Sequence, residues 1–422
     1  MYISEGIPYG FTSIAMVAFM RRAGLSLEQI GVFVAALLLP WALKWAWAPL
    51  VDLIKLRRFG GRKAWIVFCT AMMIATLLLT AALDLIADFQ ALLAVIVLNN
   101  IFCATQDVAI DSLAVSTLKE DERGRGNGFM FGGQFLGITL GGGVAIFVYG
   151  AWGFNASLVY VSGLLFLNLL FIIFFVNDPD AGKSESKPRH DILRALLVSV
   201  QDFAKEVYSS FLKSGNGPKW GLVYALLPFA SLALAYATLS TIQVDYGLAD
   251  NQIAKLTVYN TIAGGIGCLI GGALGDRFGI RKMLGVACLL TALPTIVLAA
   301  QISNLGLESV SAAVLYGAII LHGLFFGMAF ALSVAVLMGM TNPAVAATQF
   351  TAFMAMKNVT LSYTNYWQGI VAERVDYAMV LYIDAVLLLI PMLILPFLKS
   401  REEELQSKGE LTQLVPDPVA AK

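Results

Sequence analysis

Long apolar stretches recur along the whole chain and are separated by short polar connections. A helix needs about 20 apolar residues to cross the hydrocarbon core of a bilayer, and most of the stretches reach that length. The pattern predicts an all-α integral membrane protein with twelve transmembrane helices. Their approximate ranges are 2–20, 27–50, 64–86, 90–117, 128–150, 156–176, 220–243, 251–274, 283–301, 310–340, 347–371 and 377–398.

The composition agrees with a membrane protein and excludes other classes. Of the 422 residues, 59% are hydrophobic and only 13% are charged, whereas soluble domains carry about 25% charged residues. The net charge is zero, so the chain lacks the basic surface of a nucleic-acid-binding protein. The four cysteines lie inside apolar stretches without metal-ligand spacing, so we expect no metal and no other cofactor. The lipid bilayer is the partner that this composition implies.

Basic residues gather in the connections that follow even-numbered stretches. Arg57, Lys119 and Arg281 are examples, whereas the opposite connections hold few basic residues, chiefly Arg21 and Arg22. Basic connections stay on the cytoplasmic side of a membrane, so we expect both termini to be cytoplasmic. The longest internal polar segment then divides the chain into two six-helix halves. The predicted organisation is a first half over 1–176, a cytoplasmic linker over 177–219 with an amphipathic helix at 191–214, a second half over 220–398, and a cytoplasmic tail over 399–422 that is expected to be disordered.

Two connections at matching places in the halves resemble each other. APLVDLIKLRRFGGRKAW (48–65) and GALGDRFGIRKML (272–284) both place an aspartate, a glycine and two adjacent basic residues in that order. The second copy resembles the G-x-x-x-D-R-x-G-R-R/K signature of the major facilitator superfamily. The charges either set topology or form an ion-pair latch that breaks when the two halves rock. The candidate latch residues are Asp52, Arg62, Lys63, Asp276, Arg277, Arg281 and Lys282.

A few ionisable residues fall inside the predicted spans. A charge at mid-bilayer costs about 2.5–3.5 kcal/mol on insertion scales, so such residues are functional candidates by default. In ATQDVAIDSLAV (104–115), Asp107 and Asp111 are four residues apart and share one helical face. Two such neighbours cannot both ionise cheaply, so one should hold a proton near neutral pH. The candidate proton or substrate residues are Glu5, Gln106, Asp107, Asp111, His322 and Lys357.

The partners of these groups remain open at the level of sequence. Lys44 and Asp111 stand at similar depth, so we expect Lys44 to form an ion pair with Asp111 and to leave Asp107 freer. Lys357 either binds an anionic group of a substrate or pairs with Asp384 or Asp111. Glu5 either belongs to the same site or faces cytoplasmic water. For Asp384 we expect a structural partner.

Glycines at four-residue spacing mark two helices for close packing. They are Gly133, Gly137 and Gly141 in the fifth stretch, and Gly264, Gly267, Gly271 and Gly275 in the eighth. GxSxG, HExxH and P-loop motifs do not occur in the sequence, so neither hydrolysis nor ATP use is indicated, and we do not expect an enzyme.

Four segments together resemble the AmpG-type permeases of the same superfamily. They are EGIPYGF (5–11), LKWAWAPLVD (43–52), ATQDVAIDSL (104–113) and TNPAVAATQF (341–350). The resemblance implies a monomeric carrier of the bacterial inner membrane that imports a small-molecule solute with protons by alternating access. It also implies a central cavity lined by helices one, four, seven and ten, on which Glu5, Asp107 and His322 fall. Anhydro-muropeptide is the leading substrate, a siderophore or other peptide-like metabolite is the alternative, and a non-transporting membrane sensor or scaffold is the alternative of another class.

Overall fold

The structure, a computed structural model, describes residues 1–48, 51, 61–117, 133–178, 216–341 and 346–399, with single positions between 198 and 211. This described part is helical and contains no strand. The predicted tail after residue 399, most of the predicted linker helix and Asp52 lie outside the described residues.

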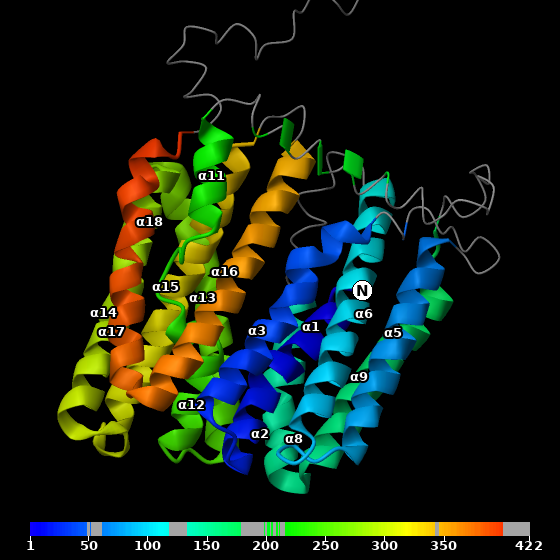
Figure 1. Cartoon of the computed structure of the whole chain (residues 1–422), viewed down its shortest axis with the longest axis horizontal. Coiled ribbons are helices and arrows are strands. Elements are labelled where there is room, and N and C mark those ends of the chain that lie inside the picture. The colour runs from blue at the N-terminus through cyan, green and yellow to red at the C-terminus, as the bar shows by residue number, and fades with distance from the viewer. Residues whose placement is uncertain are drawn as a thin grey trace, which may run out of the picture.

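Helices of the first half cross the molecule six times (Figure 1). The first crossing is made by α1 and α2 with a π-helical turn between them, and the fifth also contains a π-helical turn. The elements are α1 (Ile3–Gly10), the turn Phe11–Ala15, α2 (Met16–Ala23), α3 (Leu27–Leu43), α5 (Arg62–Leu79), α6 (Phe89–Thr117), the fifth helix Gly133–Trp152 with its turn at Thr139–Val144 and its last part α8 (Ala145–Trp152), and α9 (Phe154–Phe175).

The second half repeats this arrangement, and nine helices in the described part of the chain are long and apolar enough to cross a membrane unaided. The remaining crossings are the broken first and seventh helices and the more polar α16. The elements of the second half are α11 (Gly217–Ala225), α12 (Ala237–Asp245), α13 (Asp250–Phe278), α14 (Ile280–Leu305), α15 (Ala312–Gly339), α16 (Ala346–Arg374), α17 (Tyr377–Leu387) and α18 (Leu389–Ile394).

Several helix pairs join the halves. One is α3 with α16, which lie side by side in the middle of Figure 1, and another is the fifth helix with α13. The α3–α16 pair is antiparallel: the Ser362 hydroxyl donates to the carbonyl of Ala35 at 2.8 Å, and Gly31 lies against Gly369. We call the two ends of the bundle the α11 end, at the top of Figure 1, and the Arg21 end, at the bottom.

The seventh crossing differs from its prediction. The stretch 220–243 was expected to form one helix, but the structure ends α11 at Ala225 and starts α12 at Ala237. Pro228 explains the break, because proline lacks an N–H and its ring clashes with the carbonyl four residues earlier. Neighbouring side chains satisfy the freed carbonyls: Thr360 donates to Ala225 at 2.8 Å, and Tyr363 donates to Leu226 at 2.7 Å. We call residues 226–236 the unwound segment.

Candidate functional site

An ion pair inside the first half joins Lys44 to Asp107. The α-helical part of α3 ends at Leu43, and a 3-10 turn over Lys44–Ala46 follows it beside α6. From that turn the Lys44 ammonium donates a hydrogen bond to the Asp107 carboxylate. Asp107 is only 4% exposed, whereas 26% of the Lys44 side chain is exposed. The expected pairing of Lys44 with Asp111 is therefore wrong, because depth alone did not show which of two residues one helical turn apart faces α3.

Asp111 has a partner of its own. It is half-buried one turn further along α6, and its carboxylate accepts a hydrogen bond from the Tyr2 hydroxyl. Because Asp107 bonds to α3 and Asp111 to the start of the first helix, the two carboxylates are held by different elements. Of these two carboxylates, Asp107 is the one whose charge is balanced by a cation.

Glu5 is buried beside this pair rather than facing water. It is 3% exposed, and its Oε1 atom accepts a hydrogen bond of 2.6 Å from Gln134 Nε2 in the fifth helix. Its Oε2 atom is buried and has no hydrogen-bond donor among the described residues. Asp107 and Lys44 lie close enough to act electrostatically on the Glu5 carboxyl group. Pro8 lies inside α1, a π-helical turn follows that helix, and α1 packs against α6.

A chain of neutral side chains completes the cluster. Gln106 is fully buried, donates to the Thr70 hydroxyl, and accepts from the Ser4 hydroxyl at 3.3 Å. The site therefore brings together three carboxyl groups and one ammonium group from the first, second and fourth crossings. We call Glu5, Lys44, Asp107 and Asp111 the acid–lysine cluster. Its carboxyl groups can bind or release protons. When Asp107 binds one, its ion pair with Lys44 becomes a hydrogen bond.

His322 does not join this cluster. It is fully buried in α15, and its Nε2 atom lies 2.8 Å from the carbonyl oxygen of Ser231 in the unwound segment. The Ser231 hydroxyl in turn donates to Asp384 at 2.6 Å, and Asp384 also accepts from the backbone N–H of Ala233 at 2.9 Å and from Gln368 at 3.1 Å. Three of these bonds hold the unwound segment, and the bond from Gln368 holds the Asp384 carboxylate in place. We expected a structural partner for Asp384, and its partners are neutral hydrogen-bond donors.

Lys357 lies apart from every carboxylate that the structure describes around it. It is 5% exposed, and its Nζ atom donates to the Ser333 hydroxyl at 3.1 Å. The same atom stands 4.0 Å from the ring centroid of Phe229 and 5.1 Å from that of Phe330. The sequence left open whether Lys357 pairs with Asp384 or Asp111. In this structure it pairs with neither of them.

The candidate latch residues form no bond with one another in the described part of the repeat. Asp276 and Arg277 are exposed, and Lys282 is exposed as well. Arg281 donates to the carbonyl of Leu398 at 3.0 Å, Arg62 pairs with Asp178, and Lys63 donates to the carbonyl of Ile173 at 2.7 Å. All three contacts stay within one half of the molecule. Asp52 lies outside the described residues, so the latch remains a prediction.

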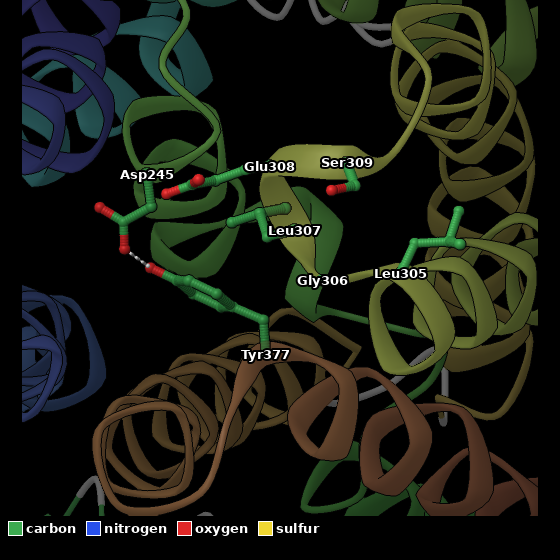
Figure 2. Close-up of a pocket in the computed structure, with 7 residues that line it drawn as sticks. All are labelled: Asp245, Leu305, Gly306, Leu307, Glu308, Ser309 and Tyr377. Carbon is green, nitrogen blue, oxygen red and sulfur yellow. Dashed lines mark hydrogen bonds between the residues drawn. The ribbon is translucent and has the colours of Figure 1, made fainter.

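The Arg21 end holds ionic contacts that the sequence analysis missed. Arg21 forms two hydrogen bonds of 2.6 Å with Asp245, which also accepts from Tyr377 at 2.7 Å, and Arg22 pairs with Asp250 at 2.7 Å. Both pairs join the first half to the second. Figure 2 shows Asp245 and Tyr377 on the wall of a cavity of about 560 Å³ at this end. The sequence did indicate these pairs. The acidic residues Asp245 and Asp250 complement Arg21 and Arg22, the two arginines that depart from the cytoplasmic placement of basic residues.

The packing glycines let helix backbones touch at two places. A Cβ atom on Gly137 or Gly141 would stand 2.5 or 1.9 Å from a carbonyl oxygen of α1, and Gly133 also faces that helix. A Cβ atom on Gly267 would stand 1.9 Å from the carbonyl oxygen of Leu324 in α15, and Gly271 meets Met328 on the same helix. The fifth helix is thereby held against the helix that carries Glu5.

Comparison with known proteins decides the family. The sequence model of the Major Facilitator Superfamily matches residues 1–254 and, in a second match, residues 221–421. The chain belongs to this superfamily. The resemblance to its AmpG-type permeases is confirmed, since the chain is 26% identical over 398 residues to the anhydromuropeptide permease of Escherichia coli, covering 93% of this chain and 77% of that protein. It is also 23% identical over 299 residues to the putative transporter AmpG 4 of Rickettsia conorii, covering 68% and 70% of the two chains.

Solved structures of the superfamily share the fold. The inward open conformation of the xylose transporter XylE from Escherichia coli matches with a TM-score of 0.68 at 13% identity and covers 98% of both chains. A mutant of the nucleoside transporter NupG matches with a TM-score of 0.69 at 15% identity and covers 94% of this chain and 97% of that one. The predicted fold of twelve helices in two halves is confirmed. This major facilitator protein is a multi-pass membrane transporter of the AmpG-like type.

Proposed function

We propose that this chain is a proton-coupled carrier that imports an organic solute across the inner membrane of a bacterium. The observation that carries the proposal is the acid–lysine cluster, in which three carboxyl groups surround one ammonium group inside the membrane. Ionisable groups at membrane depth mark proton and substrate pathways. The alternative of a non-transporting sensor gives no reason to retain such a costly cluster.

Protonation of Asp107 is the proposed coupling step. A proton on Asp107 removes the charge that attracts Lys44, so the ion pair between α3 and α6 becomes an ordinary hydrogen bond or breaks. A ligand changes a conformational equilibrium only through different interactions with the two states. The Lys44–Asp107 pair offers that difference, because it exists only while Asp107 is ionised. Glu5 and Asp111 lie close enough to interact electrostatically with Asp107, so they are the groups with which it would share the proton.

The proposed orientation places the α11 end in the cytoplasm. The helices that follow the second and eighth crossings begin at that end with the basic residues Arg62, Lys63, Arg281 and Lys282, and basic connections stay cytoplasmic. The Arg21 end then faces outward, and the structure has ionic contacts between the halves there: Arg21–Asp245, Arg22–Asp250 and Glu28–Arg374. We therefore assign the structure to a state that is fastened on the outer side. Both termini are cytoplasmic in this proposal, and the carrier works as a monomer.

Anhydro-muropeptide is the proposed solute, because an Escherichia coli relative that aligns with 93% of this chain is an anhydromuropeptide permease. The test is uptake of labelled anhydro-muropeptide into sealed vesicles that carry the protein, with an imposed pH gradient and with or without a protonophore. The proposal predicts accumulation that stops when the protonophore collapses the gradient. Vesicles that accumulate none would exclude this solute, and a ferric siderophore would be the next probe. Accumulation that ignores the protonophore would exclude proton coupling.

A further inference from the structure

The second half holds a buried cation whose environment differs from that of Lys44. Lys357 contacts one neutral hydroxyl, Ser333, and the faces of two rings, Phe229 and Phe330. It has no ion pair within the described part of the chain. A buried charge is normally paired or bonded by several polar groups. Aromatic faces attract a cation, but they leave two of the three ammonium hydrogens without an oxygen acceptor among the described residues.

Lys44, in the turn that continues α3, and Lys357, in α16, stand at matching depth on one of the helix pairs that join the halves. The backbone N–H of Leu27 donates to Glu373 at 2.6 Å and the Ser362 hydroxyl to Ala35 at 2.8 Å, which fixes the register of α3 and α16. At the Arg21 end, α3 begins at Leu27 and α16 ends at Arg374. Lys44 is as many residues after Leu27 as Lys357 is before Arg374. One half thus presents an excess of carboxyl groups at this level, and the other presents a cation that has no ion pair among the described residues.

The surroundings of Lys357 are able to rearrange around a ligand. Phe229 belongs to the unwound segment, and irregular backbone at membrane depth is tolerated where it lines a cavity or a protein interior. Phe330 is only half-buried, so the movement of one ring exposes the ammonium group. Broken helices of transporters typically form their ligand sites. A single lysine, as a point charge without a bidentate fork, suits a singly charged carboxylate.

We propose that Lys357 is the anchor for a carboxylate of the transported solute, with Ser333 as its hydrogen-bonding neighbour and Phe330 as the ring that covers the empty site. This rests on the proposed transport function and adds the chemical class of group that the solute must carry. The solute carboxylate replaces the Phe330 face next to Nζ and supplies the charge that the protein does not. No bond is formed or broken in this step.

The experiment measures binding to the purified full-length protein in detergent. Three probe pairs are used: anhydro-muropeptide, N-acetyl-alanyl-alanine and citrate, each against its methyl ester. The variants are Lys357→Met, which keeps the length but not the charge, and Lys357→Arg, which keeps the charge. Lys255→Met, on an exposed lysine of α13 in the same half, is the matched control. Thermal unfolding of each variant shows that it is folded.

The proposal predicts that wild type binds at least one acid tenfold or more tightly than its ester. Lys357→Met should bind that acid and its ester equally, Lys357→Arg should keep part of the preference, and Lys255→Met should behave as wild type. The proposal is overturned if no pair shows an acid preference in wild type, or if Lys357→Met retains one. Failure of proton coupling appears separately, as acid-selective binding without gradient-driven uptake.

Discussion

Lys44 at the end of α3 bonds to Asp107, while Asp111, one turn further along α6, bonds to Tyr2. The two carboxylates of one helical face therefore have partners of different charge. Among the described residues a cation holds Asp107 and none holds Asp111, so protonation of Asp107 changes the contact between two helices. Protonation of Asp111 changes a bond to a neutral phenol. This difference makes Asp107 the centre of the proposed coupling.

Breaking the Lys44–Asp107 pair from one side should destabilise the protein more than removing both charges. Removing one partner of a buried ion pair costs about 3–5 kcal/mol, and the 26% exposure of Lys44 places the expected loss near the lower value. We expect Lys44→Met to lower the free energy of unfolding by about 3 kcal/mol. The double variant Lys44→Met, Asp107→Asn should recover most of this loss in chemical unfolding in detergent. Simple addition of the two single losses would contradict the pairing.

Reversing the charges of the Arg21–Asp245 pair should open and then close the Arg21 end. Arg21→Asp places two carboxylates face to face, and Asp245→Arg places two cations there, whereas the double variant restores an opposite pair. The distance between spin labels on the exposed residues 87 and 304, measured by pulsed electron resonance, reports the separation of the halves. We expect longer distances in each single variant and a return toward wild type in the double variant. Unchanged distances in both single variants would show that the pair does not hold the halves together.

Two glycines of α13 should respond differently to the same substitution. A Cβ atom on Gly267 would stand 1.9 Å from the Leu324 carbonyl oxygen, whereas one on Gly265 has nothing within 4 Å. Overpacking costs about 1–3 kcal/mol, and alanine is favoured over glycine in a helix by about 1 kcal/mol. Gly267→Ala should therefore lower the thermal midpoint in detergent, and Gly265→Ala should leave it unchanged or raise it. Equal midpoints for the two variants would argue against the α13–α15 contact.

Asp384→Asn should weaken the fold without changing proton dependence. Asp384 accepts from Ser231 and from the backbone of Ala233, and each hydrogen bond to a charged group is worth about 1.5–3 kcal/mol. Asparagine keeps one acceptor oxygen but no charge, so the bonds from Ser231 and Ala233 weaken, and its amide nitrogen cannot accept the bond from Gln368. The thermal midpoint should therefore fall. Asp376→Asn is the control, because asparagine caps a helix as well as aspartate does. A loss of gradient dependence at an unchanged midpoint would instead give Asp384 a place in coupling.

The number of crossings and most helix ranges followed from the sequence because bilayer thickness sets the length of each apolar stretch. The seventh crossing is the main difference. Hydropathy treats Pro228 as one more apolar residue, whereas its missing N–H decides where α11 ends. The hydrogen bonds that stabilise the chain at this break come from α16 and α17, far along the chain, so the local sequence does not show them.

Residues of the candidate site were recognisable from the sequence, but their partners were not. A charge inside an apolar stretch is visible in any sequence, which is why Glu5, Lys44 and Asp107 stood out. Pairing depends on the rotation of each helix about its axis, so Asp111 was chosen over Asp107 on depth alone. The contact of Arg21 with Asp245 was missed for a related reason, because it depends on how the two halves meet at one end.

The most direct test of the central claim separates coupling from translocation in one protein. Vesicles carrying Asp107→Asn, Asp111→Asn or wild type would be assayed for uptake of anhydro-muropeptide driven by a pH gradient, and for exchange of internal for external solute without a gradient. The account predicts that Asp107→Asn loses gradient-driven accumulation by at least tenfold while it still exchanges, and that Asp111→Asn keeps most of both. Accumulation by Asp107→Asn at the wild-type level, still sensitive to a protonophore, would show that the proton is carried elsewhere.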